Sequence, residues 1–328
     1  MRFLIPVSGM SEVIHMSMDV SLEKLKNPNL WEPIPENEKM GAEDITAPQI
    51  TFWGDVWRRF RKNRLAVLGL VLLVMILLFA IVGPWVSPYS YDKQDYDAIL
   101  EAPNLKHIFG TDYVGRDLFT RVMYGARISL AVGFLAAMVQ LVIGVLYGGI
   151  SGFIGGKVDE IMMRIVDIMY AIPILLIVIL LMVVLGPGLV NIFLALGFFY
   201  WLGMARIVRS QILTLKEEEF VLAARVLGAS TRRLLLRHLI PNAMGPVIVT
   251  VTLNIPNAIF TEAFLSYIGL GVSAPMASLG SLASDGVEYI RTAPWLMLFP
   301  ALTIALIALA FNFVGDGLRD SLDPRLRR

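Results

Sequence analysis

The sequence has no cysteine, few histidines and few charged residues. Without cysteine, the chain cannot form disulfides, thiolate nucleophiles or cysteine-ligated metal sites. The three histidines, His15, His107 and His238, lie far apart in the sequence, which argues against a histidine metal cluster. We therefore expect no catalytic residues and no bound metal.

Apolar residues take the place of the missing charges. They make up 56% of the chain, charged residues make up 17%, and the mean hydropathy is +0.68. A soluble domain carries about 25% charged residues, so this excess of apolar surface requires lipid as its solvent. The formal net charge of +1 offers no broad positive field for nucleic acid. The composition indicates a membrane protein that contacts lipid.

The N-terminal segment does not resemble a signal peptide, because its apolar stretch is too short. Residues 1–51 are polar and rich in proline, and they predict a cytoplasmic tail outside the membrane.

Six later stretches approach the 20 or so apolar residues that a helix needs to cross the hydrocarbon layer. They cover roughly residues 65–86, 128–154, 162–186, 189–208, 244–271 and 295–315. None alternates with a period of two as a barrel strand would. The sequence therefore predicts an all-α integral membrane protein with six transmembrane helices.

Lysine and arginine residues are distributed unevenly between the two sides of these spans. From Arg58 onward, eighteen lie within or next to the segments on the side that holds both termini, and six lie on the other side: Lys93, Lys106, Arg116, Arg121, Arg127 and Arg291. Basic residues concentrate on the cytoplasmic side of membrane proteins. We therefore expect cytoplasmic termini, a short C-terminal tail at 317–328 and an external loop that ends at residue 127.

Two carboxylates are placed within or near the expected spans. A charge in mid-membrane is costly and should face the bundle interior or a wet cavity. Asp167 fits either such a cavity or an interfacial ion pair with a nearby arginine. Glu262 fits a cavity or subunit contact as well as it fits structural pairing.

Prolines interrupt two of the spans. Pro173 and Pro256 each remove a backbone hydrogen bond and can kink their helices. Asn254, Asn257 and Thr261 stand near Pro256 and could bond the freed backbone groups or face water. With Asp167 and Glu262, the two prolines and the two asparagines form a candidate translocation path or gate, and better packing of a bent helix is the alternative.

The glycine-rich stretch Gly148–Lys157 does not match a phosphate-binding loop. Ser151 stands where the pattern requires glycine, and Val158 stands where it requires Ser or Thr. The glycines between residues 144 and 156 are better explained as small residues that allow helices to pack closely. No nucleotide site is predicted on this chain, so its energy must come from a partner or from a gradient.

The loop at 209–243 is predicted to contain two short helices. The first covers about Leu215–Leu227, with Phe220, Ala223, Ala224 and Leu227 on one face and Gly228 as its stop. Ser230 can cap the second, which we expect to end before Pro241. Small residues on an exposed helix suit a protein partner. A hairpin on the membrane surface fits equally well.

The stretch EFVLAARVLGAS at 219–230, followed by RHLIPN at 237–242, resembles the cytoplasmic loop of bacterial ATP-binding-cassette import permeases. The family signature is Glu-Ala-Ala, three residues, then Gly. Leu222 stands at the glutamate position of this signature, which puts any contact made by that glutamate in doubt. The resemblance implies a coupling loop that docks on an ATPase subunit. Its implied residues are Glu219, Phe220, Ala223, Ala224, Arg225, Gly228, Ala229, Arg237, His238, Pro241 and Asn242.

Further segments resemble the C-type permease of the dipeptide and oligopeptide branch. They occupy residues 57–70, 110–130, 262–275 and 311–328, so the resemblance begins near Phe52. It implies a first helix and external loop at 52–127 and a core permease domain at 128–316. The pairs Asp112–Arg116 and Asp117–Arg121 have the i, i+4 spacing of a short outer helix, which we interpret as a brace.

The resemblance implies a heteromeric importer in the bacterial or archaeal plasma membrane. Its partners would be a homologous B-type permease, two ATPase subunits that bind ATP and magnesium, and an extracytoplasmic substrate-binding protein. Peptides are the expected substrates, and nickel, glutathione and oligosaccharides are the alternatives. A gradient-driven secondary transporter is the rival class, but it would usually show internal repeats. A membrane-embedded hydrolase would need paired catalytic groups within the spans, and none is visible.

Overall fold

A computed structural model describes residues 51–272 and 274–323 of the chain. These residues form helices and contain no β-strand. Apart from Thr51, the expected N-terminal tail lies outside the described residues, as do the last five residues. The helices are α3 (Phe52–Lys62), α4 (Arg64–Ile81), α5 (Gly83–Val86), α6 (Leu118–Val139), α7 (Val145–Ile154), α8 (Gly156–Ala171), α9 (Ile174–Leu185), α10 (Leu189–Leu215), α11 (Glu219–Val226), α12 (Thr231–Arg233), α13 (Ile240–Tyr267), α14 (Leu279–Val287) and α15 (Trp295–Leu322), with a 3-10 turn at Tyr96–Ala98 and π-helical segments at Gln140–Gly144 and Leu234–Leu239.

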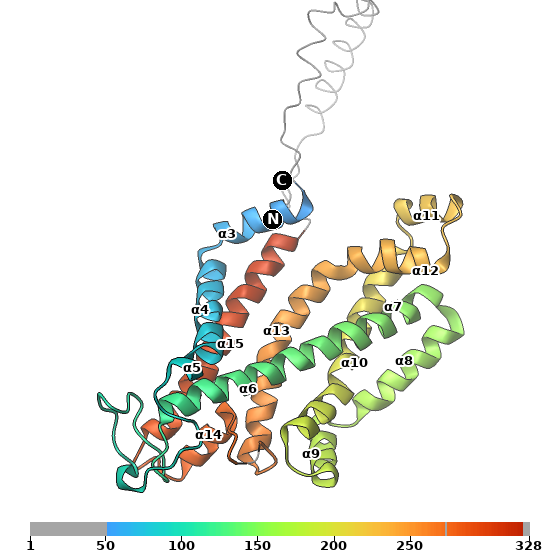
Figure 1. Cartoon of the computed structure of the whole chain (residues 1–328). Helices are drawn as coiled ribbons and strands as arrows, with labels where there is room; N and C mark the ends of the chain where they lie inside the picture. Colours follow the sequence, from blue (N-terminus) through green and yellow to red (C-terminus); the bar gives the residue numbers. More distant parts are fainter. Residues whose placement is uncertain (1–50, 273, 324–328) are drawn as a thin grey trace, which may run out of the picture. The chain divides into compact units, whose positions relative to one another are not determined.

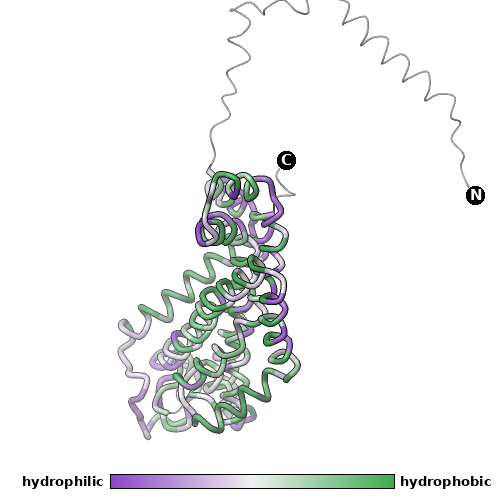
Figure 2. Tube along the Cα trace, turned by 90° about the vertical axis from the view of Figure 1, so that its right-hand side faces the viewer, coloured by the Kyte–Doolittle hydropathy of each residue, from purple (hydrophilic) through white to green (hydrophobic). Residues whose placement is uncertain are grey.

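Five helices in the described part of the chain are long and apolar enough to cross a membrane. They are Arg64–Ile81, Leu118–Ile154, Leu189–Leu215, Thr231–Tyr267 and Trp295–Leu322. The pair α8 and α9 forms a sixth candidate and is bent by 80° at a short break. Every expected span thus corresponds to a long helix or to this bent pair, which confirms the predicted all-α membrane fold. Figure 2 shows that hydrophobic residues dominate along these helices.

Pro173 lies at the break between α8 and α9, as its missing backbone donor predicts. Pro256 behaves differently, because α13 continues through it without a break. The effect of a proline on these helices therefore depends on the packing around it.

The second span begins about ten residues earlier than its apolar stretch suggests. Asp117 caps α6 by accepting hydrogen bonds from the backbone nitrogen and hydroxyl of Thr120, at 2.8 and 2.7 Å.

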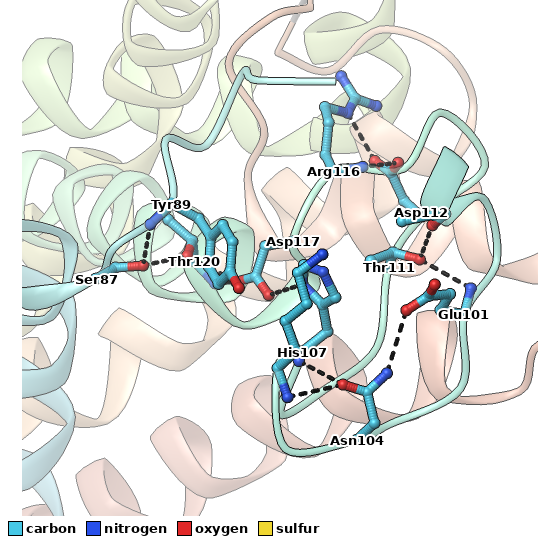
Figure 3. A network of polar contacts seen from close by, with 12 residues as sticks. Ser87, Tyr89, Glu101, Asn104, His107, Thr111, Asp112, Arg116, Asp117 and Thr120 are labelled. Carbon is cyan, nitrogen blue, oxygen red and sulfur yellow. Dashed lines mark hydrogen bonds and ion pairs between the residues drawn. The ribbon is translucent and has the colours of Figure 1, made fainter. Parts of the chain in front are cut away.

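The prediction of a short outer helix before the second span is wrong. Asp112 and Arg116 do pair, at 2.7 Å, but they lie in the loop before α6. Arg121 approaches Asp112 and not Asp117, whose other oxygen contacts buried His107 (Figure 3). These side-chain contacts are consistent with the predicted bracing role of the segment, but the segment is a folded loop and not a helix.

Glycines allow the second span to pack directly on α10. A Cβ at Gly148 would lie 2.2 Å from the carbonyl oxygen of Ala205, and one at Gly144 would lie 2.6 Å from Cβ of Met204. Gly152, one further turn along, faces the backbone of Arg209. This confirms that Gly144, Gly148 and Gly152 serve close helix packing. The prediction is wrong for Gly155 and Gly156, which have φ values of +69° and +55° at the turn between α7 and α8 and make no close helix contact.

The helix ends divide between two ends of the bundle. The helices α3 and α11 and the C-terminal end of α15 lie at one end (Figure 1). The loop before α6, α9 and α14 lie at the other end. This arrangement places α11 and α3 on the same side of the membrane.

Candidate coupling surface and translocation surface

The helix α11 stands at the end of the bundle between α10 and the long helix that begins at Thr231. Its first turn carries Glu219, whose negative charge is stabilising beside the positive N-terminal end of the helix dipole. The helix begins later than the predicted Leu215, because α10 continues to Leu215 and a turn follows it.

A left-handed glycine ends α11. Gly228 has a φ of +81°, as the sequence predicted for the stop of this helix. The next residue, Ala229, donates its backbone N–H to the carbonyl of Ala224 at 3.0 Å. Ser230 then caps the following helix by accepting from the backbone nitrogen of Arg233. Both predicted local signals are confirmed.

Only a narrow face of α11 contacts the rest of the chain. Val221 is fully buried, and Ala224 and Ala229 pack against the main hydrophobic core. The prediction that Ala224 shares a face with Phe220, Ala223 and Leu227 is therefore wrong in part, because Ala224 faces inward.

The outer face of α11 is apolar and exposed. Val226 and Leu227 are 88% and 87% exposed, and Phe220 and Leu222 are about four-tenths exposed. Ala223 is also exposed, and its small side chain leaves space between these larger ones. Glu219 and Arg225 are exposed on the same helix. Large side chains so open to solvent at the tip of a hairpin make this face a candidate site for contact with another protein or with the membrane surface.

The second helix of the loop does not end before Pro241. It is continuous from Thr231 to Tyr267 and widens into a π-helical segment at Leu234–Leu239. A π-bulge accommodates a proline that lacks the N–H of a regular helix. Arg237 is exposed in this segment, and His238 is half-buried. The expected stop is thus replaced by a rigid connection from the hairpin into α13.

Pro241 and Asn242 are exposed and line a cavity of about 930 Å³ at this end of the bundle. Its walls come from α3, α10, α13 and α15. Along α13 the lining continues through Pro246, Val249 and Leu253, which share one face of the helix. This face leads from the hairpin toward the middle of the bundle.

A second cavity of about 340 Å³ lies further along α13. Asn254, Asn257 and Thr261 line it from α13, and Tyr170 and Tyr200 line it from α8 and α10. The Tyr200 hydroxyl lies 2.8 Å from the Thr261 hydroxyl and donates to the carbonyl of Asn257 at 3.2 Å. These neutral groups can donate and accept hydrogen bonds without fixing a charge.

Among the predicted path residues, Asn254 and Asn257 therefore lie together. Asp167 lies on α8 in an exposed ion pair with Arg206, at 2.7 Å. Of the two roles considered for Asp167, this is the interfacial ion pair and not the wet cavity. Arg206 also stacks on the Tyr170 ring, with its guanidinium carbon 4.1 Å from the centroid. Pro173 is exposed at the bend. Thr261, expected near Pro256, lines the same cavity, whereas no local pattern in the sequence predicted Tyr200 there.

Pro256 and Glu262 face the inside of the chain. Glu262 is 0% exposed and accepts hydrogen bonds from the hydroxyls of Ser266, at 2.7 Å, and Ser129, at 3.2 Å. The Ser129 oxygen in turn accepts from the backbone nitrogen of Leu279, at the start of α14. Glu262 thus joins α6, α13 and α14, and structural pairing describes it better than a place on the path.

Comparison with known proteins agrees with this geometry. The family model for the binding-protein-dependent transport system inner membrane component matches residues 118–328, and that for the N-terminal TM domain of oligopeptide transport permease C matches residues 51–103.

Similar curated proteins match over nearly the whole chain. The oligopeptide transport system permease protein OppC of Bacillus subtilis is 52% identical, over 92% of this chain and 98% of its own. The dipeptide transport system permease protein DppC of the same organism is 48% identical, over 92% and 94%. The OppC protein of Escherichia coli K12 is 48% identical, over 87% and 95%.

The fold also resembles a solved structure. An inward-facing structure of the MetNI methionine ABC transporter covers 62% of this chain and 96% of its own, with a TM-score of 0.52 at 19% identity. Residues 118–328 carry the family match, and they contain α11, the whole lining of the second cavity and all of the first cavity's lining except its α3 wall. The chain belongs to the family of binding-protein-dependent transport system inner membrane components.

Proposed function

We propose that the chain is the C-type permease subunit of an ATP-driven importer of dipeptides or oligopeptides in the bacterial cytoplasmic membrane. Peptide substrates are supported by the names of relatives that are 46–52% identical over most of the chain. A homologous B-type permease would complete the path, two ATPase subunits would supply the energy, and an external binding protein would deliver the peptide.

The observation that carries this proposal is the exposed apolar face of α11, held by one narrow contact and joined rigidly to α13. An ATPase subunit docked on Ala223, Val226 and Leu227 would move the hairpin. Because the helix is continuous from Thr231 to Tyr267, that motion would reach the face of α13 that lines both cavities. ATP binding would thereby open the path outward, and hydrolysis would reset it.

The neutral lining of the second cavity suits a varied peptide cargo. Asn254, Asn257, Thr261 and Tyr200 offer amide and hydroxyl groups that match a peptide backbone whatever its side chains. A single cysteine in place of Asn257 should react with a membrane-impermeant thiol reagent during transport. The matched control is a cysteine in place of buried Ala258. If the cysteines at positions 257 and 258 were equally unreactive toward the reagent, Asn257 would not line the path.

Two substitutions test the coupling role on the whole complex. Ala223→Trp should abolish peptide transport and either release the ATPase or leave its activity unresponsive to the loaded binding protein. Ala223→Ser, which keeps the surface low, is the matched control. Normal transport by the tryptophan variant would contradict the assignment.

Gly228 provides an independent test, because no atom lies within 4 Å of a Cβ built there and only its left-handed φ opposes a side chain. Asparagine tolerates this conformation and valine does not. We expect Gly228→Asn to transport and Gly228→Val to fail while the chain remains in the membrane. Equal transport by both variants would show that the shape of this turn is not needed for coupling.

A further inference from the structure

The helix α3 is amphipathic and rigidly attached to the bundle. Val56 and Phe60, four residues apart, are buried, and Phe60 packs with Val314 of α15 in a small hydrophobic cluster. A Cβ at Gly317 would lie 3.1 Å from the Phe60 ring and 2.2 Å from Ala66, so α15 approaches this corner closely. One face of α3 is therefore fixed, and its other faces are presented to the surroundings.

An aromatic flank lies on one side of this fixed face. Trp53 and Trp57 are four residues apart and remain 59% and 51% exposed. Tryptophan is enriched where a protein crosses the boundary between hydrocarbon and headgroups, because its ring is apolar and its N–H is polar. Trp53 also lines the cavity at this end of the bundle. The exposed Trp57 is therefore the residue that indicates contact with that boundary.

A basic cluster lies at the C-terminal end of α3. Arg61, Lys62 and Arg64 are exposed, and none has an ion-pair or hydrogen-bond partner from its side chain within residues 51–272 and 274–323. Arg58 and Arg59 differ, because both contact the carboxylate of Asp55, at 2.7 and 2.9 Å.

The hydrogen bond from Arg58 lowers the pKa of Asp55, so this carboxylate stays ionised at neutral pH and offsets part of the positive charge on α3. The three remaining cations are the ones available to an anionic partner.

The first span places this cluster at the membrane surface. Asn63 ends α3 and caps α4 by accepting from the backbone nitrogens of Leu65 and Ala66. The helix α4 has a mean hydropathy of 2.9 and only 22% of it is buried within the chain, so most of its surface is left for lipid. Figure 1 shows α3 lying across the end of α4. The cations therefore stand where hydrocarbon gives way to phosphate.

We propose that α3 is a binding site for the headgroups of anionic phospholipids. Arg61, Lys62 and Arg64 contact the phosphates, and Trp57 inserts beside them at the upper edge of the acyl chains. A free phosphate would explain the cations but not the exposed Trp57 or the adjoining lipid-facing span. This site needs only that α4 crosses the membrane, so it is independent of the substrate and of the coupling role of α11.

The test compares lipids retained by the intact complex in native mass spectrometry, after incubation with phosphatidylglycerol or phosphatidylcholine. The variant Arg61→Gln/Lys62→Gln/Arg64→Gln should bind phosphatidylglycerol at least about tenfold more weakly, since each cation at the surface contributes about fivefold. The matched control, Lys93→Gln/Lys106→Gln/Arg291→Gln, removes three exposed cations from the opposite end and should bind as the unaltered protein does.

A second variant should strengthen lipid binding, a result that misfolding of the triple variant could not explain. Asp55→Asn removes the carboxylate that Arg58 and Arg59 share, so it should strengthen phosphatidylglycerol binding two- to fivefold. A bimane label at Trp57→Cys should be quenched by brominated phospholipid. Unchanged retention in both charge variants, equal retention of the two lipids, or a label that only a protein partner shields would each overturn the proposal.

Discussion

Replacing Glu262 tests the buried junction of α6, α13 and α14. In Glu262→Leu, the hydroxyls of Ser129 and Ser266 lose the oxygen that accepts from them, and Ser266 keeps only a long contact of 3.4 Å with the Ser278 hydroxyl. Each buried group left without a partner costs about 1–3 kcal/mol. Part of this loss is offset because leucine removes the cost of burying a carboxyl group. We expect the leucine variant to be less stable by about 2–4 kcal/mol.

Glu262→Gln should be far milder, since its side-chain oxygen still accepts one of the two hydroxyls. We expect a loss near 1 kcal/mol. At about 2–4 °C per kcal/mol, the thermal unfolding temperature of the purified complex should fall by roughly 4–16 °C for leucine and by no more than about 4 °C for glutamine. The glutamine variant should keep transport.

A second substitution separates the mechanism from general damage. Adding Ser266→Ala to Glu262→Leu removes one stranded hydroxyl, so the double variant should recover part of the lost stability. Two results would refute the reasoning. One is a leucine variant as stable as the parent. The other is a glutamine variant that unfolds normally yet loses transport, because the charge itself would then be needed.

Two further predictions concern topology and the tail. Reporter fusions at the C-terminus should be active on the cytoplasmic side and those near Asp97 on the external side, as the basic bias requires; an externally active C-terminal fusion would reverse the topology. Deleting residues 2–45 should leave a complex that assembles and transports, because this segment has no apolar face; absence of the complex while the shortened chain is present in the membrane would show that the tail is structural.

Local chemistry explains what the sequence could predict. The six spans depend on length and hydropathy, and the end of α11 depends on a glycine and a capping serine. Gly228 and Ser230 act within a few residues of themselves, so their roles can be inferred without the fold.

Tertiary packing explains the rest. Pro241 should end a helix by local rules, but a π-helical segment carries the helix through it. In α11, eight residues with two alanines give too little periodic signal to show that Ala224 faces inward. Glu262 is hydrogen-bonded to Ser129, 133 residues away in the sequence. No spacing rule connects such residues, so the structural role of this carboxylate had to be read from the fold.

Site-specific cross-linking tests the coupling claim most directly. The chain has no cysteine, so single cysteines at positions 220–231 are unambiguous probes. In the assembled complex, cysteines at exposed Ala223 and Leu227 should link to an ATPase subunit, and one at buried Val221 should not. The yields should change between nucleotide-free and ATP-trapped states. If no exposed position between 220 and 231 links to the ATPase in either state, α11 is not the coupling element.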